Sequence, residues 1–384
     1  MNLRFLFGCS AFVCTLVVAL VAAACFFIDH KDRESYLSID EIVRHWGYPV
    51  EVYDVPTKDG YILQLLRIPH GRLEGAQCNS SRPAVLLNHG ILTDGVMFVW
   101  NPPDSSPAFV LADAGVDVFI GSFASIDIPA FVDKALEVSG EKALYYVGYS
   151  QGVTNGLSML SDLPEYNSKI RMLFGLGSPS SARHGGGFIS LGHPFQSLLR
   201  VVFKLFRSVL GSREVPRPPC PRFYATLVDI FCTPWFMNDV CAAYMSFFFG
   251  PSSAPINLTR FSVYYSHFPM GTSTNNIIQW SVGIVGTENL HFDHYEENKR
   301  KYGQDSPPPY NYSAVDVPVH FFWSENDYFG NANELLELSK RLRPNIIQSA
   351  THISSYNHFD FTIALDAPDK IYRPIIQTIF DDYY

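Results

Sequence analysis

Short apolar runs alternate with helix-compatible segments along most of this chain. The runs span residues 84–87, 116–120, 143–147, 172–176 and 317–323, and helical segments such as 129–138 and 152–160 lie between them. Unbroken runs of this length are typical of parallel strands that are covered on both faces. The alternation therefore predicts an α/β fold with a mostly parallel central sheet and helical crossovers.

Two more strand-like segments, 50–55 and 61–68, come before the parallel strands. Lys58-Asp59-Gly60 lies between them, and Asp-Gly between two such segments is a hairpin signal. We expect an antiparallel pair there.

The alternation stops between Ser178 and Val317, where a simple connection would need few residues. This interval holds aromatic-rich, helix-compatible pieces such as "SLLRVVFKLFRSVL" and "CAAYMSFFFG". It predicts a mainly helical cap at 181–312, inserted between two parts of the core at 33–180 and 313–384. Its Leu, Val and Phe side chains fit either an acyl-chain site or an ordinary core, and core is the commoner use.

The first residues have the order of a secretory signal peptide. Arg4 precedes an uncharged run at 5–28, with small alanines at 22–24, so cleavage is expected near residue 25. The alternative is a membrane anchor, because the run is long enough to span a bilayer. Asn79, Asn257 and Asn311 lie in N-x-S/T sequons, which agrees with passage through the secretory pathway.

Charge and cysteine usage narrow the function classes. The net charge is −9 and no basic run stands out, so nucleic acid is not expected as a partner. Beyond the first 25 residues the cysteines are Cys78, Cys220, Cys232 and Cys241, which allow three complete pairings or could be small buried thiols. No C-x-x-C motif or close His/Cys cluster indicates a metal, and no cofactor is expected.

The stretch "YYVGYSQGVT" at 145–154 holds the main chemical candidate, Ser150. A predicted strand leads into Gly148-Tyr149-Ser150-Gln151-Gly152 and a helix-compatible segment follows it, which is the setting of a nucleophile elbow. The two glycines let the backbone turn tightly. Ser150 is therefore the expected nucleophile, and it needs a base and an acid.

In this kind of fold the acid and then the base follow the nucleophile along the chain. Asp327 comes just after the strand at 317–323, with Glu325 as its rival. His358 follows the last predicted strand, 346–353, whereas the competing His352 lies inside that strand. We predict Asp327 as the acid and His358 as the base.

An oxyanion hole needs two backbone N–H donors. Gln151 would supply one at the start of its helix, and Ile91 the other from the loop after residues 84–87, where Gly90 allows a close approach. His89 is expected to shape that loop rather than to transfer protons.

From about Ser38 onward the chain resembles the acid lipases, the gastric and lysosomal acid lipase group of α/β-hydrolases. The matching motifs, in order, are "HWGYPVEVYDVPTKDGYILQLLRIPHG", "LLNHGILTDG", "LADAGVDVFIG", "YYVGYSQG", "PMGTS" and "YNHFDF…DAP". The resemblance implies hydrolysis of lipid esters at a lipid–water interface, a cap over the site, and a lysosomal or extracellular location. By the same motifs it implies the triad Ser150, Asp327 and His358, the oxyanion donors Ile91 and Gln151, and a disulfide between Cys232 and Cys241.

The chain departs from the family's pattern in two places. After "DVFIGS" the family carries an Asn-x-Arg-Gly-Asn loop and an aromatic-rich stretch, whereas here Gly121-Ser122 runs almost directly into "SIDIPAFVDKALE". About twenty residues remain between the two strands, and a crossover needs a dozen or more. Tyr149 also replaces the family's usual His. Because of the missing segment, a catalytically impaired lipase-like protein is the alternative to an active lipid esterase. A third hypothesis, less in keeping with the motifs, is an α/β-hydrolase peptidase.

Overall fold

The computed structural model describes residues 33–57, 60–73, 81–121, 127–181, 183–192, 238–285 and 289–384. Single residues and pairs are also described at 198, 201–202, 205, 208–209, 214–215, 227–228 and 231–232. The leader at 1–25, Asn79, Cys78, Cys220, two of the hairpin-turn residues (58–59) and residues 122–126 lie outside this set. None of the helices in the described part of the chain is both long and apolar enough to cross a membrane.

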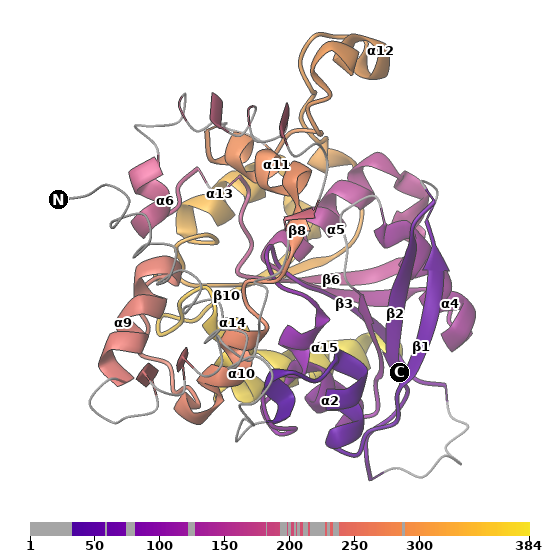
Figure 1. The fold of residues 1–384 in the computed structure, drawn as a ribbon. Coiled ribbons are helices and arrows are strands. Elements are labelled where there is room, and N and C mark those ends of the chain that lie inside the picture. The colour runs from indigo at the N-terminus through magenta and orange to yellow at the C-terminus, as the bar shows by residue number, and fades with distance from the viewer. Residues whose placement is uncertain are drawn as a thin grey trace, which may run out of the picture.

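An eight-stranded sheet forms the centre of the molecule, in the order β1-β2-β4-β3-β5-β6-β9-β10 (Figure 1). β1 pairs antiparallel with β2, and β2 antiparallel with β4, whereas all later pairs are parallel. The predicted α/β fold is confirmed, including the antiparallel pair at its start. The strands are β1 (Glu51–Pro56), β2 (Ile62–Ile68), β3 (Ala84–Asn88), β4 (Asp117–Gly121), β5 (Leu144–Tyr149), β6 (Ile170–Leu176), β9 (Val319–Trp323) and β10 (Ile347–His352).

Helices cover both faces of this sheet, because alternate residues of each central strand point to opposite sides. Val85 and Tyr145 join one apolar cluster, while their neighbours Leu86 and Tyr146 join the other. The helices of the core are α2 (Ile39–His45), α3 (Pro107–Asp113), α4 (Ile128–Ser139), α5 (Gln151–Asp162), α13 (Ala332–Arg341), α14 (Asp360–Ile363) and α15 (Arg373–Tyr383). Residues of α3 and α15 pack in the first cluster, and those of α4, α5 and α13 in the second.

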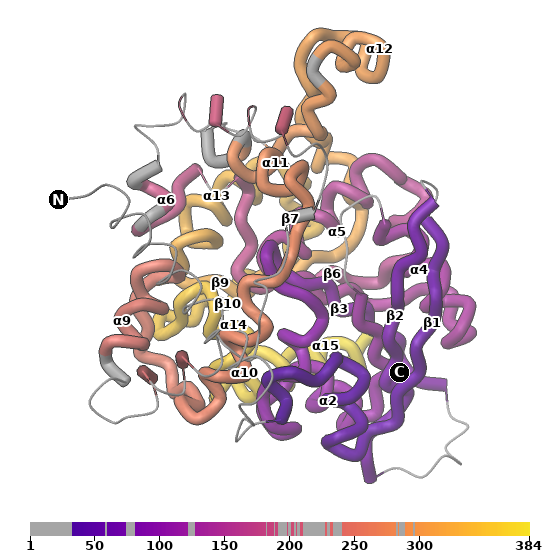
Figure 2. Tube along the Cα trace, in the orientation of Figure 1, coloured from indigo at the N-terminus to yellow at the C-terminus, as the bar shows by residue number. Residues whose placement is uncertain are grey.

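The residues between β6 and β9 form a separate set of small elements, which Figure 2 shows beside β9 and β10. We call residues 181–312 the insert. It contains α6 (Gly187–Gly192), α9 (Asn238–Phe249), α10 (Phe261–Ser266), α11 (Thr274–Val285), α12 (Asn298–Tyr302) and the short antiparallel pair β7 (Glu214–Val215) and β8 (Thr272–Ser273). α12 projects from the body at the top of Figure 1.

Single helical turns complete the fold. They are η1 (Arg33–Ser35), η2 (Gly95–Phe98), η3 (Pro164–Ser168), η5 (Leu258–Arg260), η6 (Tyr295–Glu297), η7 (Tyr312–Ala314), η8 (Pro344–Ile346) and the π-helical η9 (Pro368–Tyr372). The observed strands and helices differ from the predicted bounds by one or two residues at either end, where local pattern is weakest. One such difference places His352 at the end of β10 rather than inside the strand.

A buried ion pair fastens the insert to the core. Arg260 donates from Nη1 and Nη2 to the two carboxylate oxygens of Glu34, at 2.9 and 2.7 Å, and from Nε to the carbonyl of Trp100 at 3.0 Å. Removing one partner of such a pair leaves a buried charge uncompensated, at a cost of about 3–5 kcal/mol.

Candidate active site

Ser150 occupies the turn between β5 and α5. Its backbone has φ 51° and ψ −118°, a left-handed conformation that is costly for a residue with a Cβ. Gly152 relieves crowding on the helix side, because a Cβ there would lie 2.2 Å from the carbonyl oxygen of Asn88. The first turn of α5 can therefore pack directly against the end of β3, which leaves the serine side chain at the carboxyl edge of the sheet.

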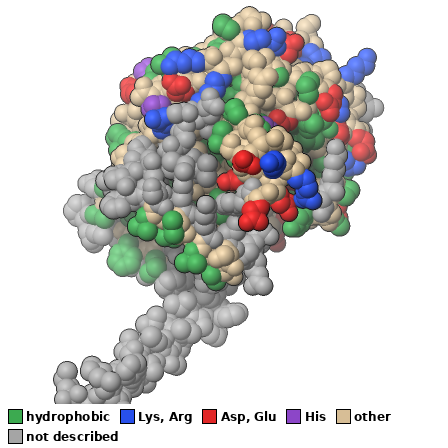
Figure 3. Space-filling model, turned by 90° about the horizontal axis from the view of Figure 1, so that it is seen from above, with side chains coloured by type: hydrophobic (Ala, Val, Ile, Leu, Met, Phe, Trp, Pro, Cys, Tyr) green, Lys and Arg blue, Asp and Glu red, His purple; other side chains and the backbone are tan. Residues whose placement is uncertain are grey.

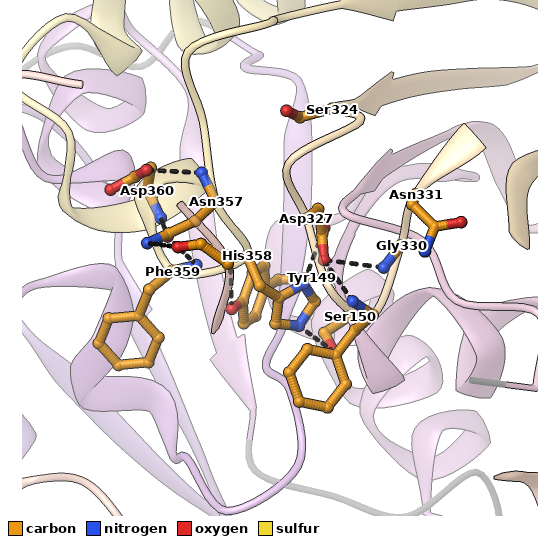
Figure 4. A network of polar contacts seen from close by, with 12 residues as sticks. Tyr149, Ser150, Ser324, Asp327, Gly330, Asn331, Asn357, His358, Phe359 and Asp360 are labelled. Atoms are coloured by element: carbon orange, nitrogen blue, oxygen red, sulfur yellow. Dashed lines mark hydrogen bonds and ion pairs between the residues drawn. The ribbon is translucent and has the colours of Figure 1, made fainter. Parts of the chain in front are cut away.

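Three side chains that are far apart in the sequence form one hydrogen-bonded chain at this edge (Figure 4). Ser150 Oγ lies 2.8 Å from His358 Nε2, and His358 Nδ1 lies 2.8 Å from Asp327 Oδ2. Ser150 follows β5, Asp327 follows β9 and His358 follows β10. All three are buried. Because parallel strands end at the same edge of the sheet, the loops that follow them meet there.

The loop after β9 fixes the Asp327 carboxylate. Its Oδ1 accepts hydrogen bonds from the backbone N–H groups of Phe329, at 2.7 Å, and Gly330, at 2.8 Å. That leaves Oδ2 for His358. Gly177, at φ +53° after β6, makes room for this pair, since a Cβ there would lie 2.8 Å from Oδ2 and 3.2 Å from His358 Nδ1.

The backbone of His358 is held from both sides. Its N–H donates to the carbonyl of Phe249, the last residue of α9, at 3.1 Å. Its carbonyl accepts from the Tyr149 hydroxyl at 2.9 Å. The imidazole packs against the rings of Tyr149 and Phe329, with centroid distances of 5.0 and 4.5 Å. Burial, together with the negative charges of Asp327 and Asp360, raises the pKa of Tyr149 well above its usual value, so the hydroxyl stays a donor.

Replacing Tyr149 with phenylalanine should lower kcat for ester hydrolysis by about fivefold with little change in KM. The ring contacts remain, and only the hydrogen bond to the carbonyl of His358, of about 1 kcal/mol net, is lost. Steady-state kinetics on a soluble ester, with enzyme concentration set by active-site titration, measures this.

Tyr372→Phe is the matched control, since its buried hydroxyl also donates to a backbone carbonyl, that of Phe361, at 2.9 Å. Equal losses of kcat in the two variants would show that Tyr149 contributes to general stability alone.

The two predicted oxyanion donors lie on either side of the nucleophile. Gln151 is the first residue of α5, and Ile91 lies in the loop after β3. Within the described residues, neither backbone N–H donates to a backbone carbonyl of the surrounding loops. The side chain of Gln151 pairs with Asn276 of α11: Gln151 Nε2 donates to Asn276 Oδ1 at 2.5 Å, and Asn276 Nδ2 donates to Gln151 Oε1 at 3.2 Å. No pattern in the sequence indicates this contact between the insert and the nucleophile elbow.

The rival acid and base are paired with each other on the surface. Glu325 hydrogen-bonds to His352, and both side chains are about half exposed. His89 lies in the loop after β3, where burial lowers its pKa, and its Nδ1 lies 2.7 Å from the carbonyl oxygen of Gly90. This contact is in keeping with a role in shaping the loop.

One buried carboxyl beside the site was missed by sequence reasoning. Asp360 Oδ2 accepts from the backbone N–H of Asn357 at 2.6 Å, and Asn357 Oδ1 accepts from the N–H groups of Phe359 and Asp360, at 2.9 and 3.1 Å (Figure 4). Burial raises the pKa of Asp360 to about 7. Asn357 and Asp360, which bond to each other's backbone N–H groups, lie on either side of His358 in the chain. The sequence does contain a local pattern for this arrangement: an Asn three residues before an Asp at the start of a helix.

The structure joins Cys232 to Cys241 by a disulfide, with a Cα–Cα distance of 5.7 Å. Cys241 lies on α9, the helix whose last carbonyl holds His358. Of the sequon asparagines, Asn311 is exposed and Asn257 is partly exposed. Within the described residues, no group of three or more His, Cys, Asp or Glu could hold a metal ion.

The fold and this constellation define the class, an α/β-hydrolase. Residues 39–102 match the model of the partial alpha/beta-hydrolase lipase region. Among solved structures, a soluble variant of the monoglyceride lipase of Saccharomyces cerevisiae has the same fold, with a TM-score of 0.53 and 13% identity. The superposed residues cover 87% of this chain and 94% of the yeast lipase.

Two curated relatives are similar over nearly the whole length. Lipase lipl-3 of Caenorhabditis elegans is 34% identical over 407 aligned positions, which cover 98% of this chain and 99% of the relative. The gastric triacylglycerol lipase of Homo sapiens is 31% identical, over 91% of this chain and 92% of the relative. The chain belongs to the acid lipase family, and it is a carboxylic-ester hydrolase. The alignment with lipl-3 exceeds the 384 residues of this chain, so that relative carries residues that this chain lacks.

Proposed function

We propose that this protein hydrolyses lipid esters through an acyl-enzyme on Ser150, with His358 as general base and Asp327 as its orienting acid. The observation that carries the proposal is the buried hydrogen-bond chain of 2.8 Å from Ser150 to His358 and 2.8 Å from His358 to Asp327. A serine hydroxyl becomes a competent nucleophile only when such a base can take its proton.

The steps follow from these contacts. Ser150 Oγ attacks the ester carbonyl carbon while His358 Nε2 takes the hydroxyl proton, and the N–H groups of Ile91 and Gln151 receive the resulting oxyanion. The carbon–oxygen bond to the alcohol then breaks, and His358 returns the proton to the leaving alcohol. A water molecule, deprotonated by His358, attacks the acyl-enzyme and releases the acid and free Ser150. Asp327 stabilises the imidazolium of His358 both when the acyl-enzyme forms and when water hydrolyses it.

We further propose that the insert acts as a cap that meets a lipid surface. Several of its apolar side chains are more than 45% exposed and follow one another at helical spacing: Leu198, Val201, Val202, Leu205 and Val209. Figure 3 shows hydrophobic side chains gathered at the lower left, whereas charged groups of both signs are spread over the rest of this view. Such a surface suits an ester at a lipid–water interface.

The expected substrates are triacylglycerols or cholesteryl esters, and the expected location is lysosomal or extracellular. Gastric triacylglycerol lipase among the relatives, the leader-like first residues and the exposed sequon at Asn311 support this. Apart from contact with its lipid substrate, the protein would bind a membrane only through the leader at 1–25, and only if that leader is not cleaved.

The purified full chain should be labelled by a fluorophosphonate probe and should hydrolyse butyrate esters faster than palmitate esters. α4 still connects β4 to β5, so the sheet and the triad assemble. The wall that the family builds after Gly121 is short here, and binding energy from remote parts of the substrate drives much of the rate. Grafting a family-length segment between Ser122 and Ser125 should therefore raise the palmitate rate relative to the butyrate rate.

The outcomes separate the alternatives. Absence of both labelling and hydrolysis would identify a catalytically impaired lipase-like protein. Cleavage of peptides in preference to acyl esters would identify a peptidase. An unchanged palmitate-to-butyrate ratio after the graft would show that the shortened connection does not limit long acyl chains.

A further inference from the structure

The direction of the Ile91 N–H is set by the groups that hold the carbonyl of Gly90. Both belong to one peptide unit, which is planar and trans, so the carbonyl and the N–H point in opposite directions. A hydrogen bond that fixes the Gly90 oxygen therefore also fixes the N–H on the other side of the unit.

Two side chains contact this oxygen, His89 Nδ1 at 2.7 Å and the Thr93 hydroxyl, whose proton can only be donated to it or to a farther acceptor. Thr93 is buried, and its Oγ1 donates to the Gly90 oxygen at 2.8 Å. The hydroxyl has one proton, and its other neighbours, His89 Nδ1 at 3.3 Å and Met97 Sδ at 3.4 Å, are farther away. Leu92, at φ 57°, turns the chain back so that Thr93 faces the carbonyl three residues before it.

The same peptide unit lies against the nucleophile. A Cβ on Gly90 would be 2.9 Å from Tyr149 Cε1 and 3.1 Å from Ser150 Cβ. The insert holds the next part of the loop, because the Met270 N–H donates to the Leu92 carbonyl at 2.8 Å. A small rotation of the Gly90–Ile91 unit would move the N–H relative to the reacting carbonyl.

We propose that Thr93 is a positioning residue for the oxyanion hole: its hydroxyl orients the Ile91 N–H through the Gly90 carbonyl. This inference rests on the proposed function, in which that N–H receives the oxyanion. The sequence predicts that His89 shapes this loop, and its Nδ1 does contact the same oxygen; Thr93 is a second side chain on that oxygen, which the sequence pattern does not indicate.

Thr93→Val replaces the hydroxyl with a methyl group of similar shape. We expect kcat on a butyrate ester to fall about tenfold with KM unchanged, because the oxyanion contact is made in the transition state and not in the bound substrate. Complete loss of an oxyanion donor costs about 10²–10³ in kcat, and a misdirected donor should cost less. The rate of fluorophosphonate labelling should fall in parallel. Thr93→Ser, which keeps the hydroxyl, should restore most of the kcat.

Thr362→Val is the matched control, since Thr362 is also buried and its hydroxyl donates to the carbonyl three residues earlier, that of Phe359, at 3.1 Å. Wild-type kcat in Thr93→Val, or an equal loss in Thr93→Ser, overturns the inference while Ser150-dependent hydrolysis by the wild type still stands. A rise in KM with unchanged kcat overturns it as well, because it would indicate a substrate contact. If the wild type neither hydrolyses esters nor is labelled, the proposed function fails and this inference fails with it.

Discussion

Replacing Ser150 with alanine is expected to abolish ester hydrolysis, with kcat falling by about 10⁵-fold or more, and to abolish fluorophosphonate labelling. The hydroxyl is the group that would bond to the acyl carbon, and its oxygen lies 2.8 Å from His358 Nε2, the base that would take its proton. The fold should survive, because the loss is a single atom at the edge of the sheet. Labelling followed by gel fluorescence and mass spectrometry, with secretion or thermal unfolding measured in parallel, tests both parts.

Ser161→Ala is the control for this experiment. Ser161 lies on the same helix, α5, and is also buried, but its hydroxyl makes no hydrogen bond within the described part of the chain. It should be labelled and active like the wild type. Probe adducts that persist in Ser150→Ala would falsify the assignment of the nucleophile.

The central strands could be predicted from the sequence because a strand that is buried on both faces consists mainly of apolar residues. Every residue of β3, β4 and β5 is buried, so these strands appear as short apolar runs, with Asn88 at the end of β3 and Asp117 at the start of β4 as the exceptions. The apolar pattern predicts that β6 starts at 172, whereas the strand starts two residues earlier, at Ile170. Arg171 interrupts the apolar pattern there, since its guanidinium leaves the strand to reach Asp382 at 3.2 Å.

The candidate site divides in the same way into local and long-range features. Ser150 is recognisable because the strand, the turn and the helix that position it are contiguous in the chain. The hydroxyl of Tyr149 donates to the carbonyl of His358, 209 positions away, and the side chain of Gln151 donates to that of Asn276, 125 positions away. No local pattern encodes such contacts, because they depend on how the insert and the last loops pack. Resemblance to the family predicts the three residues Ser150, Asp327 and His358 by position, but not the side chains that hold them in place.

Chain order alone does not distinguish the two acids of one loop, since Glu325 and Asp327 both follow β9. Asp327 is fully buried and lies 2.8 Å from His358, whereas Glu325 is half exposed and bonded to His352. Burial and hydrogen bonding therefore separate two carboxylates that differ by only two positions. This difference leads to opposite expectations for their amide variants.

Asp327→Asn should lower kcat by about 10³–10⁴-fold, whereas Glu325→Gln should leave it within about twofold of the wild type. The backbone N–H groups of Phe329 and Gly330 both donate to Oδ1, so the amide oxygen of the asparagine must remain there. Its NH₂ group would then face His358 Nδ1, which would have to accept rather than donate. The ring proton would move to Nε2, the nitrogen that must take the proton from Ser150, and the base would be blocked. Kinetics of both variants on a butyrate ester, normalised to folded protein, tests the argument. A large loss in Glu325→Gln with little effect in Asp327→Asn would place the acid two residues earlier and would show that the buried contact to His358 is not the one that catalysis uses.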